Sequence, residues 1–433
     1  PELREHADYI KKVISAEEER FSRTIDQGLS ILNSLMDNVA KAAIEGKRRI
    51  LSGIEAFKLQ DTFGFPLDLT KEIAAEAGIE VDEDTFRAEL QKQREKARED
   101  RRKKDISGWS GDLFGELDAE PTVFVGYDEL EANAKVLALS DGEELTEAVS
   151  TDDGPKEGVL VVLDRTPFYA ESGGQVGDMG YLTADGVKLK VVGCKKTPKG
   201  FYVHTCTLES GLLVTGAQLV ATVSRRLRMA TARNHTAAHL LQAALREVLG
   251  MHVHQAGSYE DAQRVRFDFT HFGAVTAEEL RQVEKIVNAK IYDALPVVTR
   301  VMPIREAKAL GAMALFGEKY GDEVRVVSID DFSTELCGGT HVTNTAMLGG
   351  FKILSESSAA AGIRRIEGVT GTNLLALLDE RTDELAQIAD KLKVGNIADL
   401  PVRVAALNAE LHELRSELEK AKAAAANQKV EGL

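Results

Sequence analysis

Apolar side chains recur at helical spacing in the N-terminal part of the chain. Their positions are Ile10, Val13, Ile14, Phe21, Ile25, Leu29 and Leu32. Because charged residues fill the gaps, this spacing predicts an amphipathic helix over residues 10–35. A turn-rich segment at 57–70, FKLQDTFGFPLDLT, then precedes a helix at 71–77, and a charged helix is expected over 84–102. Residues 1–104 therefore indicate an all-helical unit.

The pattern changes after residue 107, where glycine, aspartate and proline separate short runs of strand-forming residues. These runs are AKVLAL, GVLVVL, VKLKVVG, FYVHTCTL and AQLVATV. Strands at hairpin spacing without helices between them favour an antiparallel sheet, so we expect residues 107–223 to form a small β-barrel or sandwich. One loop, RTPFYAESGGQVGDMG, places two glycines beside Ser172 and Gln175. Such a pair either lets the backbone approach a ligand or only marks a tight turn.

Residues 224–371 contain both helical and strand patterns, which indicates an α+β unit. Helical patterns cover 235–249 and 277–294, and strand patterns occur in VRFDF, VVTRVMPI, VRVVSI and GFKILSE. The predicted fold class is therefore multidomain α+β: a helical unit, an antiparallel β-barrel, an α+β unit and a helical tail.

The tail, residues 372–433, carries apolar residues at alternating spacings of three and four. These are Val404, Leu407, Leu411, Leu414 and Leu418. They predict the seam of a short coiled coil, which would bind another helix and so support self-association. A hairpin with the helix around 385–392 is the alternative.

Composition narrows the class of protein. A chain of 433 residues is expected to hold two to four domains, and 43% hydrophobic with 29% charged residues excludes wholesale disorder. No apolar run reaches the ~18 residues of a membrane span, and no signal peptide is evident. The three cysteines are too few for a disulfide framework, so we expect a cytoplasmic protein. Because the chain begins with Pro1, we expect a piece of a longer protein.

The net charge of −16 argues against indiscriminate binding to nucleic acid. An RNA site would have to be local. Two basic stretches could supply it, QKQREKAREDRRKK at 91–104 and SRRLRMATAR at 224–233. For the first, composition alone favours a solvated, charge-laced helix.

His235 and His239 lie four residues apart on a predicted helix, so both imidazoles project from one face and can share a metal ion. Such pairs also occur without a metal. Cys337 and His341 in CGGTH repeat the spacing, and the two glycines between them let a loop fold tightly around an ion. Three imidazoles and one thiolate suit tetrahedral Zn²⁺ and are a poor match to an iron–sulfur cluster.

His252 and His254 are rival ligands for the same ion. Four protein ligands would close a tetrahedral shell, so a structural zinc is an alternative to a catalytic one. HTAAH lacks the glutamate of HExxH, which argues against a zinc peptidase. The chain has no GxxxxGK[ST] or GxGxxG pattern, so nothing independent indicates nucleotide hydrolysis or a dinucleotide cofactor.

Six segments resemble successive landmarks of bacterial alanyl-tRNA synthetases, in that family's order. They are DTFGFPLDLT, RTPFYAESGGQVGDMG, RNHTAAHLLQAALREVLG, HQAGSYEDAQRVRFDFTH, ELCGGTHV and AAGIRRIEGVTG. The resemblance implies that residues 1–104 end the helical tRNA-recognition domain, 107–223 form the barrel, 224–371 the editing domain and 372–433 begin the oligomerisation region. It also implies that the aminoacylation domain is lacking, so that the chain would not activate alanine with ATP.

In that family the editing site hydrolyses Ser-tRNA(Ala) and Gly-tRNA(Ala) made in error, and its zinc ligands correspond to His235, His239, Cys337 and His341. The resemblance thus implies an aminoacyl-tRNA deacylase with Zn²⁺ as cofactor, acting on the acceptor stem and 3′ end of tRNA(Ala). The zinc would polarise the ester carbonyl, lower the pKa of water or anchor the substrate.

A site that forms a hydrogen bond with the serine hydroxyl would hydrolyse seryl-tRNA and spare alanyl-tRNA. The methyl group of alanine forms no such bond, so polar groups of the site would stay unpaired. Gln255 in HQAGS matches a polar residue of the family's editing pocket, and Ser258, Thr236 and Thr340 are further candidates. Gln255 and Ser258 are also consistent with ordinary loop polarity. Ala238 departs from the family, many members of which have threonine just before the second histidine.

Asp61 in DTFGFPLDL matches an acidic residue that the family uses against the G3:U70 pair of the acceptor stem. A helix-capping aspartate is the alternative. Two other functions remain open: a free-standing editing protein, which the helical region 1–104 disfavours, and a tRNA-binding or dimerisation module whose zinc only holds loops together.

Overall fold

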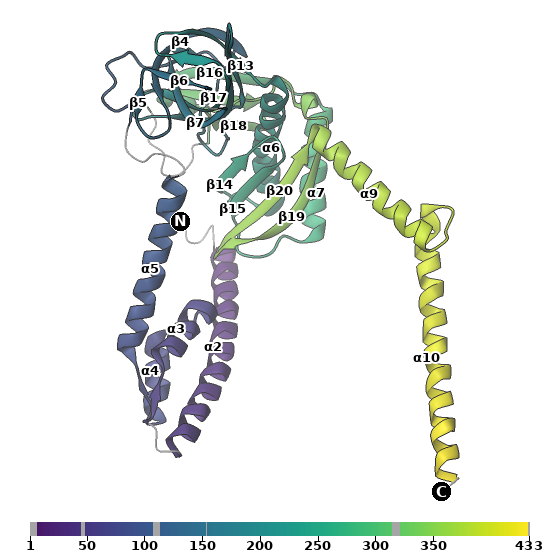
Figure 1. Ribbon diagram of the computed structural model, residues 1–433. Helices are drawn as coiled ribbons and strands as arrows, with labels where there is room; N and C mark the ends of the chain where they lie inside the picture. Colours follow the sequence, from purple (N-terminus) through teal and green to yellow (C-terminus); the bar gives the residue numbers. More distant parts are fainter. Residues whose placement is uncertain (1–6, 45–47, 107–112, 153, 314–320, 432–433) are drawn as a thin grey trace.

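The computed structural model describes residues 7–44, 48–106, 113–152, 154–313 and 321–431. Figure 1 shows a helical unit at the N-terminal end, a β-barrel, an α+β unit beside the barrel, and two C-terminal helices that extend away from it. Among the helices of the described ranges, none is long and apolar enough to cross a membrane.

Four helices make up the N-terminal unit. They are α2 (Ala7–Ile44), α3 (Gly53–Phe63), α4 (Leu67–Glu76) and α5 (Glu83–Ile106). The apolar faces of α2, α3 and α4 meet around the buried side chains of Leu32, Leu59 and Phe65, as the helical periodicity predicts.

The segment predicted as turn-rich, 57–70, is helical over most of its length. Residues 57–63 complete α3, which ends at Gly64 with a left-handed φ of 67°, and α4 begins three residues later. Gly64 and Pro66 therefore separate two helices rather than forming a long loop. The prediction of an all-helical unit is also wrong in one detail, because the short strands β1 (Ile50–Leu51) and β2 (Glu80–Val81) pair in parallel.

Six antiparallel strands close into a barrel, which confirms one of the two predicted architectures. They are β4 (Glu131–Ser140), β7 (Lys156–Leu163), β9 (Gly180–Ala184), β10 (Val187–Lys196), β11 (Tyr202–Ser210) and β13 (Gln218–Val223). The order is β13-β9-β10-β11-β7-β4, and β13 also pairs with β4 to close the ring. Alternating side chains such as Val136, Val161 and Leu189 point inward and are fully buried.

Five shorter strands accompany the barrel. They are β3 (Val123–Phe124), β5 (Leu145–Thr146), β6 (Ala148–Ser150), β8 (Arg165–Thr166) and β12 (Leu212–Val214). β3 pairs with β8, β6 with β12, and β5 with β4. The barrel loop that follows β8, residues 167–178, is one of the parts that contact the α+β unit.

The α+β unit contains two sheets, ordered β14-β15-β20-β19 and β16-β17-β18. Its elements are α6 (Arg225–Leu249), β14 (Gln255–Glu260), β15 (Val265–Thr270), α7 (Ala277–Tyr292), β16 (Val297–Pro303), α8 (Ile304–Ala309), β17 (Glu323–Ile329), β18 (Ser333–Leu336), the 3₁₀ helix η1 (Thr345–Leu348), β19 (Phe351–Ala360) and β20 (Ile363–Thr370). Helices α6 and α7 pack on each other and on the four-stranded sheet, around Leu241, Phe267 and Val287.

The C-terminal segment forms α9 (Gly371–Lys391), the short 3₁₀ helix η2 (Ile397–Asp399) and α10 (Leu400–Glu431). Figure 1 shows α10 leading away from α9, so the alternative of an intramolecular hairpin is wrong. Leu411, Leu414 and Leu418 on α10 remain 48%, 57% and 54% exposed. The apolar seam is thus open in the single chain.

Candidate metal centre

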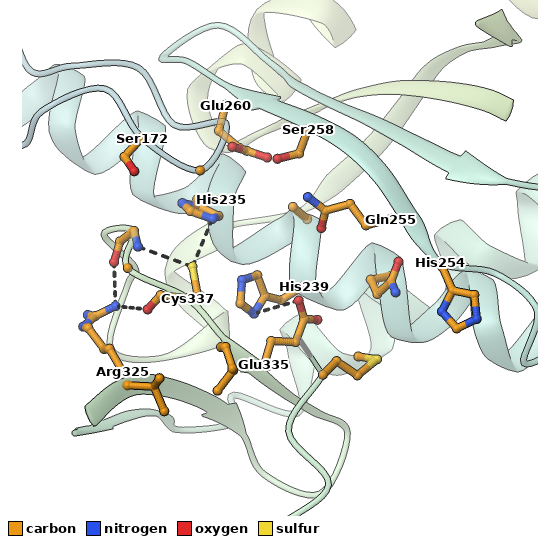
Figure 2. Close-up of a pocket in the computed structure, with 18 of the residues that line it drawn as sticks. Ser172, His235, His239, His254, Gln255, Ser258, Glu260, Arg325, Glu335 and Cys337 are labelled. Carbon is orange, nitrogen blue, oxygen red and sulfur yellow. Dashed lines mark hydrogen bonds and ion pairs between the residues drawn. The ribbon is translucent and has the colours of Figure 1, made fainter. Parts of the chain in front are cut away.

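Four predicted ligands converge between α6 and the loop after β18. One ligand atom from each of His235, His239, Cys337 and His341 lies within 4.8 Å of the others. Cys337 Sγ is 3.4 Å from His235 Nε2 and 3.3 Å from His341 Nε2. Figure 2 shows His235 directed at the sulfur, with His239 beside it on the same helix. The i, i+4 spacing on α6 and the turn of the CGGTH loop therefore bring the four donors together.

The Thr236 hydroxyl lies between a backbone carbonyl and the ring of His341. Its oxygen is 2.9 Å from Ala232 O and 3.1 Å from His341 Nδ1. This contact holds the ring with its Nε2 toward Cys337. Thr236 is fully buried and does not line the cavity. The structure thus gives this predicted catalytic residue a positioning contact with a ligand rather than a contact with substrate.

The His239 ring has fewer hydrogen bonds than the His341 ring. Its Nδ1 lies 3.8 Å from Glu335 Oε2 and is buried without a hydrogen-bond partner in the described part of the chain. Glu335 is in turn fixed by the Ser333 hydroxyl, which donates to its Oε1 at 2.9 Å. Because an unpaired buried nitrogen is costly, an ion at the cluster or a closer approach to Glu335 would remove that cost.

Burial sets the charge of the donors. It lowers the pKa of His235 and His341 well below the usual value, and neighbouring imidazoles and Arg325 add to the effect. Both rings are thus neutral at neutral pH, as ligands must be. Burial raises the pKa of the Cys337 thiol to about 12 in the metal-free chain, and a bound cation would favour the thiolate. This set of three neutral imidazoles and one thiol fits Zn²⁺.

Two side chains clamp the loop that carries Cys337. The Arg325 guanidinium donates to the carbonyl oxygens of Cys337 at 3.0 Å and Gly339 at 2.7 Å, while the Tyr127 hydroxyl donates to Gly338 O at 2.6 Å. Arg325 also lies 4.2 Å over the Tyr127 ring. A Cβ on Gly339 would lie 2.0 Å from Cε1 of His235, so this position requires glycine for the loop to pack on the imidazole.

The cluster opens onto a cavity of about 470 Å³, and His235, His239 and Cys337 form part of its wall. Gln255 and Ser258, both predicted from the sequence, also line it, as Figure 2 shows. Thr340 does not; its hydroxyl accepts a hydrogen bond from Gln175 at 2.9 Å.

Gln242 and Glu260 are among the cavity residues that were not singled out from the sequence. Gln242, one helical turn beyond Ala238, is 5% exposed, and its Oε1 has no hydrogen-bond partner in the described ranges. Glu260 is fully buried, and its carboxylate lies beside the Ser258 hydroxyl. Gln242 could have been found from its helical spacing to His235 and His239.

The barrel supplies another part of the wall, through Tyr169, Ser172 and Gly173. The loop docks by backbone pairing with β14: Glu260 N donates to Gly174 O at 2.9 Å, and Val176 N donates to Glu260 O at 3.1 Å. The two glycines of this loop therefore mark more than a turn. A Cβ on Gly174 would lie 2.2 Å from Ser258 Oγ, so the close approach needs glycine there.

Other predicted residues lie elsewhere. His252 Nε2 is 2.9 Å from His271 Nδ1 and His254 lines the cavity, but neither belongs to the four-residue cluster. Asp61 is exposed on α3 and accepts a hydrogen bond from Gln93 of α5. Because Ser52 is the N-cap of α3, the alternative that Asp61 caps a helix is wrong.

The basic stretch 224–233 is the start of α6, which begins at Arg225 rather than at His235 as predicted. Arg228 is buried in an ion pair with Asp178, and Arg233 donates to Met347 O at 2.7 Å. Two arginines of this basic stretch therefore bind groups within the chain.

Two protein-family models match the sequence. The model described as tRNA synthetases class II (A) matches residues 1–227, more than half of the 433 residues. The model described as threonyl and alanyl tRNA synthetase second additional domain matches residues 324–367, which include Cys337 and His341. The chain therefore belongs to the class II (A) tRNA synthetases, and it joins a region of that class to the second additional domain.

Within this class the curated relatives are alanine–tRNA ligases. The alanine–tRNA ligase of Thermoanaerobacter sp. (strain X514) is 49% identical over 422 residues, 98% of this chain. That of Bacillus subtilis (strain 168) is 47% identical over 420 residues, 97% of this chain. Each alignment covers 47% of the relative, so the chain spans about half the length of the curated relatives it matches.

One expectation from the sequence is wrong. The resemblance implied that the chain lacks the aminoacylation domain and is only a deacylase, but the class II (A) synthetase model matches residues 1–227. The missing GxxxxGK[ST] and GxGxxG patterns were no argument against this class, because each marks one particular nucleotide-binding loop and not nucleotide binding in general.

Proposed function

We propose that the chain edits mischarged tRNA, hydrolysing the aminoacyl ester of Ser-tRNA(Ala) and Gly-tRNA(Ala) at a zinc site formed by His235, His239, Cys337 and His341. The observation that carries the proposal is the placement of three of these donors on the wall of the cavity. A purely structural zinc has no need of a cavity, whereas hydrolysis needs room for an ester and a water molecule.

Zn²⁺ bound at this cluster would supply Lewis-acid stabilisation of the charge that develops on the ester carbonyl. The chain's own residues would position the ion and the substrate. His235 and His341 are held with their Nε2 atoms toward Cys337, and the barrel loop forms part of the cavity wall. Gln255 and Ser258 present hydrogen-bonding groups to a bound aminoacyl group.

Discrimination between serine and alanine rests on unpaired polar groups. Gln242 lines the cavity, and its buried Oε1 has no partner in the described chain. A serine hydroxyl can donate to it, whereas an alanine methyl would keep it desolvated and unpaired, at about 1–3 kcal/mol. Many family members have a threonine at the position of Ala238. We infer that in this chain Gln242 provides the hydrogen bond to the serine hydroxyl instead.

The partner that fits this function is tRNA(Ala), whose 3′ end would enter the cavity. Asp61 is exposed on α3 and free to meet an acceptor stem, apart from its contact with Gln93. We infer that it reads the G3:U70 pair. The test is hydrolysis of G3:U70 and G3:C70 substrates: the wild type should prefer G3:U70 and Asp61→Ala should lose the preference. Equal rates with the wild type would refute the role of Asp61.

The seam of Leu411, Leu414 and Leu418 supports self-association through α10, in the manner of a coiled coil. Sedimentation of the chain at increasing concentration tests this. A mass that rises toward that of a dimer supports pairing, and a constant monomer mass refutes it.

The editing proposal is tested by initial rates on seryl-, glycyl- and alanyl-tRNA(Ala). Fast release of serine and glycine with slow release of alanine is expected. The competing function, a binding module with a structural zinc, predicts no hydrolysis of any substrate. It also predicts that Cys337→Ala unfolds the α+β unit, whereas the editing proposal predicts lost hydrolysis with circular dichroism largely retained.

A further inference from the structure

Gln175 belongs to the barrel, yet its side chain contacts the metal centre of the α+β unit. We propose that Gln175 is a positioning residue that fixes the tautomer of His235, so that the barrel sets the metal affinity of a site whose ligands all lie outside it. This inference rests on the proposed zinc site, and it concerns a residue of the chain rather than a step of the reaction.

Three hydrogen bonds hold the Gln175 amide. Its Oε1 lies 2.8 Å from the backbone nitrogen of Thr340 and 2.8 Å from His235 Nδ1. Its Nε2 donates to the Thr340 hydroxyl at 2.9 Å. Gln175 is fully buried, so water cannot replace these contacts.

The orientation of the amide follows from the chemistry of its partners. A backbone N–H of Thr340 can only donate, so the atom facing it must be the carbonyl oxygen. That same oxygen can only accept from His235, so the proton of the imidazole must be on Nδ1. Nε2 then carries the lone pair, and it is the atom 3.4 Å from Cys337 Sγ. The opposite tautomer would direct an N–H at the cluster.

The loop that carries Gln175 is held from both sides. Gly174 O and Val176 N, on either side of Gln175, are bonded to the backbone of Glu260, and Asp178 further along pairs with Arg228 of α6. A Cβ on Gly339 would lie 2.9 Å from Gln175 Oε1, so the CGGTH loop is packed directly against the amide. Gln175 is therefore fixed by the same contacts that join the barrel to α6 and β14.

Carbonyl partners of this kind orient metal-binding histidines and raise their basicity, and removing one costs roughly 10–100-fold in metal affinity. The test compares Gln175→Met, which keeps the length of the side chain but has no acceptor, with Gln175→Glu. A glutamate still accepts from His235 and Thr340 N, and the Thr340 hydroxyl can turn to donate to it. Gln218→Met is the matched control, because Gln218 is exposed on β13 of the same barrel.

The measurement is zinc affinity by competition with a chromophoric chelator, together with the visible spectrum of the Co²⁺-substituted chain, which reports the coordination of the ion. Gln175→Met should weaken zinc binding by roughly 10–100-fold and alter the Co²⁺ spectrum. Gln175→Glu and Gln218→Met should bind within about threefold of the wild type. Wild-type affinity in Gln175→Met would overturn the role of Gln175.

The two proposals fail in different ways. A wild-type chain that binds no zinc overturns the metal centre, whereas zinc binding that is indifferent to Gln175→Met overturns only this inference. If Gln175→Met does not fold, the ¹⁵N spectrum of histidine-labelled, metal-free wild type decides, because it distinguishes the two tautomers. An Nδ1–H signal for His235 supports the inference, and an Nε2–H signal refutes it.

Discussion

Arg228 on α6 and Asp178 on the barrel loop form a buried ion pair in which Arg228 Nε lies 2.9 Å from both carboxylate oxygens. Each side chain is 5% exposed. The guanidinium also donates to the carbonyl oxygens of Gly126 at 2.6 Å and Pro167 at 2.8 Å. One side chain of the α+β unit thus satisfies three groups of the barrel, and this joins the two units next to the cavity.

Replacing Arg228 by methionine should destabilise the chain by about 3–5 kcal/mol, because it leaves Asp178 as an uncompensated buried charge. Urea unfolding followed by circular dichroism measures this change. Arg225→Met is the control, since Arg225 is exposed on the same helix, and it should change stability by less than about 0.5 kcal/mol. Equal stability of the two variants would show that the ion pair does not hold the units together.

Glu260 should make stability depend on pH. Burial raises its pKa to about 8, against the opposing effects of the Ser258 hydroxyl and Arg266. In the unfolded chain a glutamate ionises near pH ~4.3. The folded state therefore keeps a proton that the unfolded state has lost, so Glu260 lowers stability progressively as pH rises from about 4 to about 8.

Glu260→Gln removes this titration without changing the shape of the side chain. Near pH ~8.5 it should raise the free energy of unfolding by about 3–5 kcal/mol, and near pH ~5 by less than about 1 kcal/mol. Thermal unfolding of both chains across this range is the measurement. A gain that does not depend on pH would mean that ionisation of Glu260 is not its cause.

Gln242→Leu should affect serine more than glycine. The substitution removes the buried, unpaired carbonyl oxygen of a residue that lines the cavity. Of the two aminoacyl groups, only serine has a side-chain hydroxyl that would lose this acceptor. We expect the rate of seryl-tRNA(Ala) hydrolysis to fall by roughly 10–100-fold, a loss of about 1–3 kcal/mol, with glycyl-tRNA(Ala) within about threefold of wild type. An equal fall for both substrates would refute a specific contact with the hydroxyl.

Gln255→His should impair hydrolysis of both substrates, because Gln255 lines the cavity and an imidazole differs from the amide in shape and donors. Affinity for tRNA(Ala) should stay within about twofold of wild type, since most of that binding comes from phosphate contacts outside the cavity. Filter binding and deacylation rates measure the two effects. Unchanged turnover would remove Gln255 from the site.

The sequence predicted the parts of the fold that have strong periodicity. Five runs of β-branched residues became barrel strands, and the i, i+4 histidines and CGGTH became the cluster. It missed β14 and β20, because QAGSYE has little apolar character and the arginines in IRRIEGVT interrupt the alternation. It placed the start of α6 too late, at His235, because the basic residues from Arg225 concealed the helical pattern.

Contacts between distant segments were beyond prediction. Gln175 lies 60 residues before His235 and 165 before Thr340, and no local pattern shows that these residues meet. Arg228 was assigned to a basic stretch for RNA, although its buried partner Asp178 lies 50 residues away. Such contacts depend on how the barrel docks on α6, which the spacing of residues within one element cannot reveal.

Hydrolysis of mischarged tRNA should depend on zinc at the four-residue cluster. A titration of the metal-free chain with Zn²⁺ tests this, with seryl-tRNA(Ala) hydrolysis and bound zinc followed on the same samples. The rate should rise with zinc and saturate at about one ion per chain, with His239→Ala and Cys337→Ala inactive throughout. Full activity without zinc, or a fully loaded chain without hydrolysis, would contradict it.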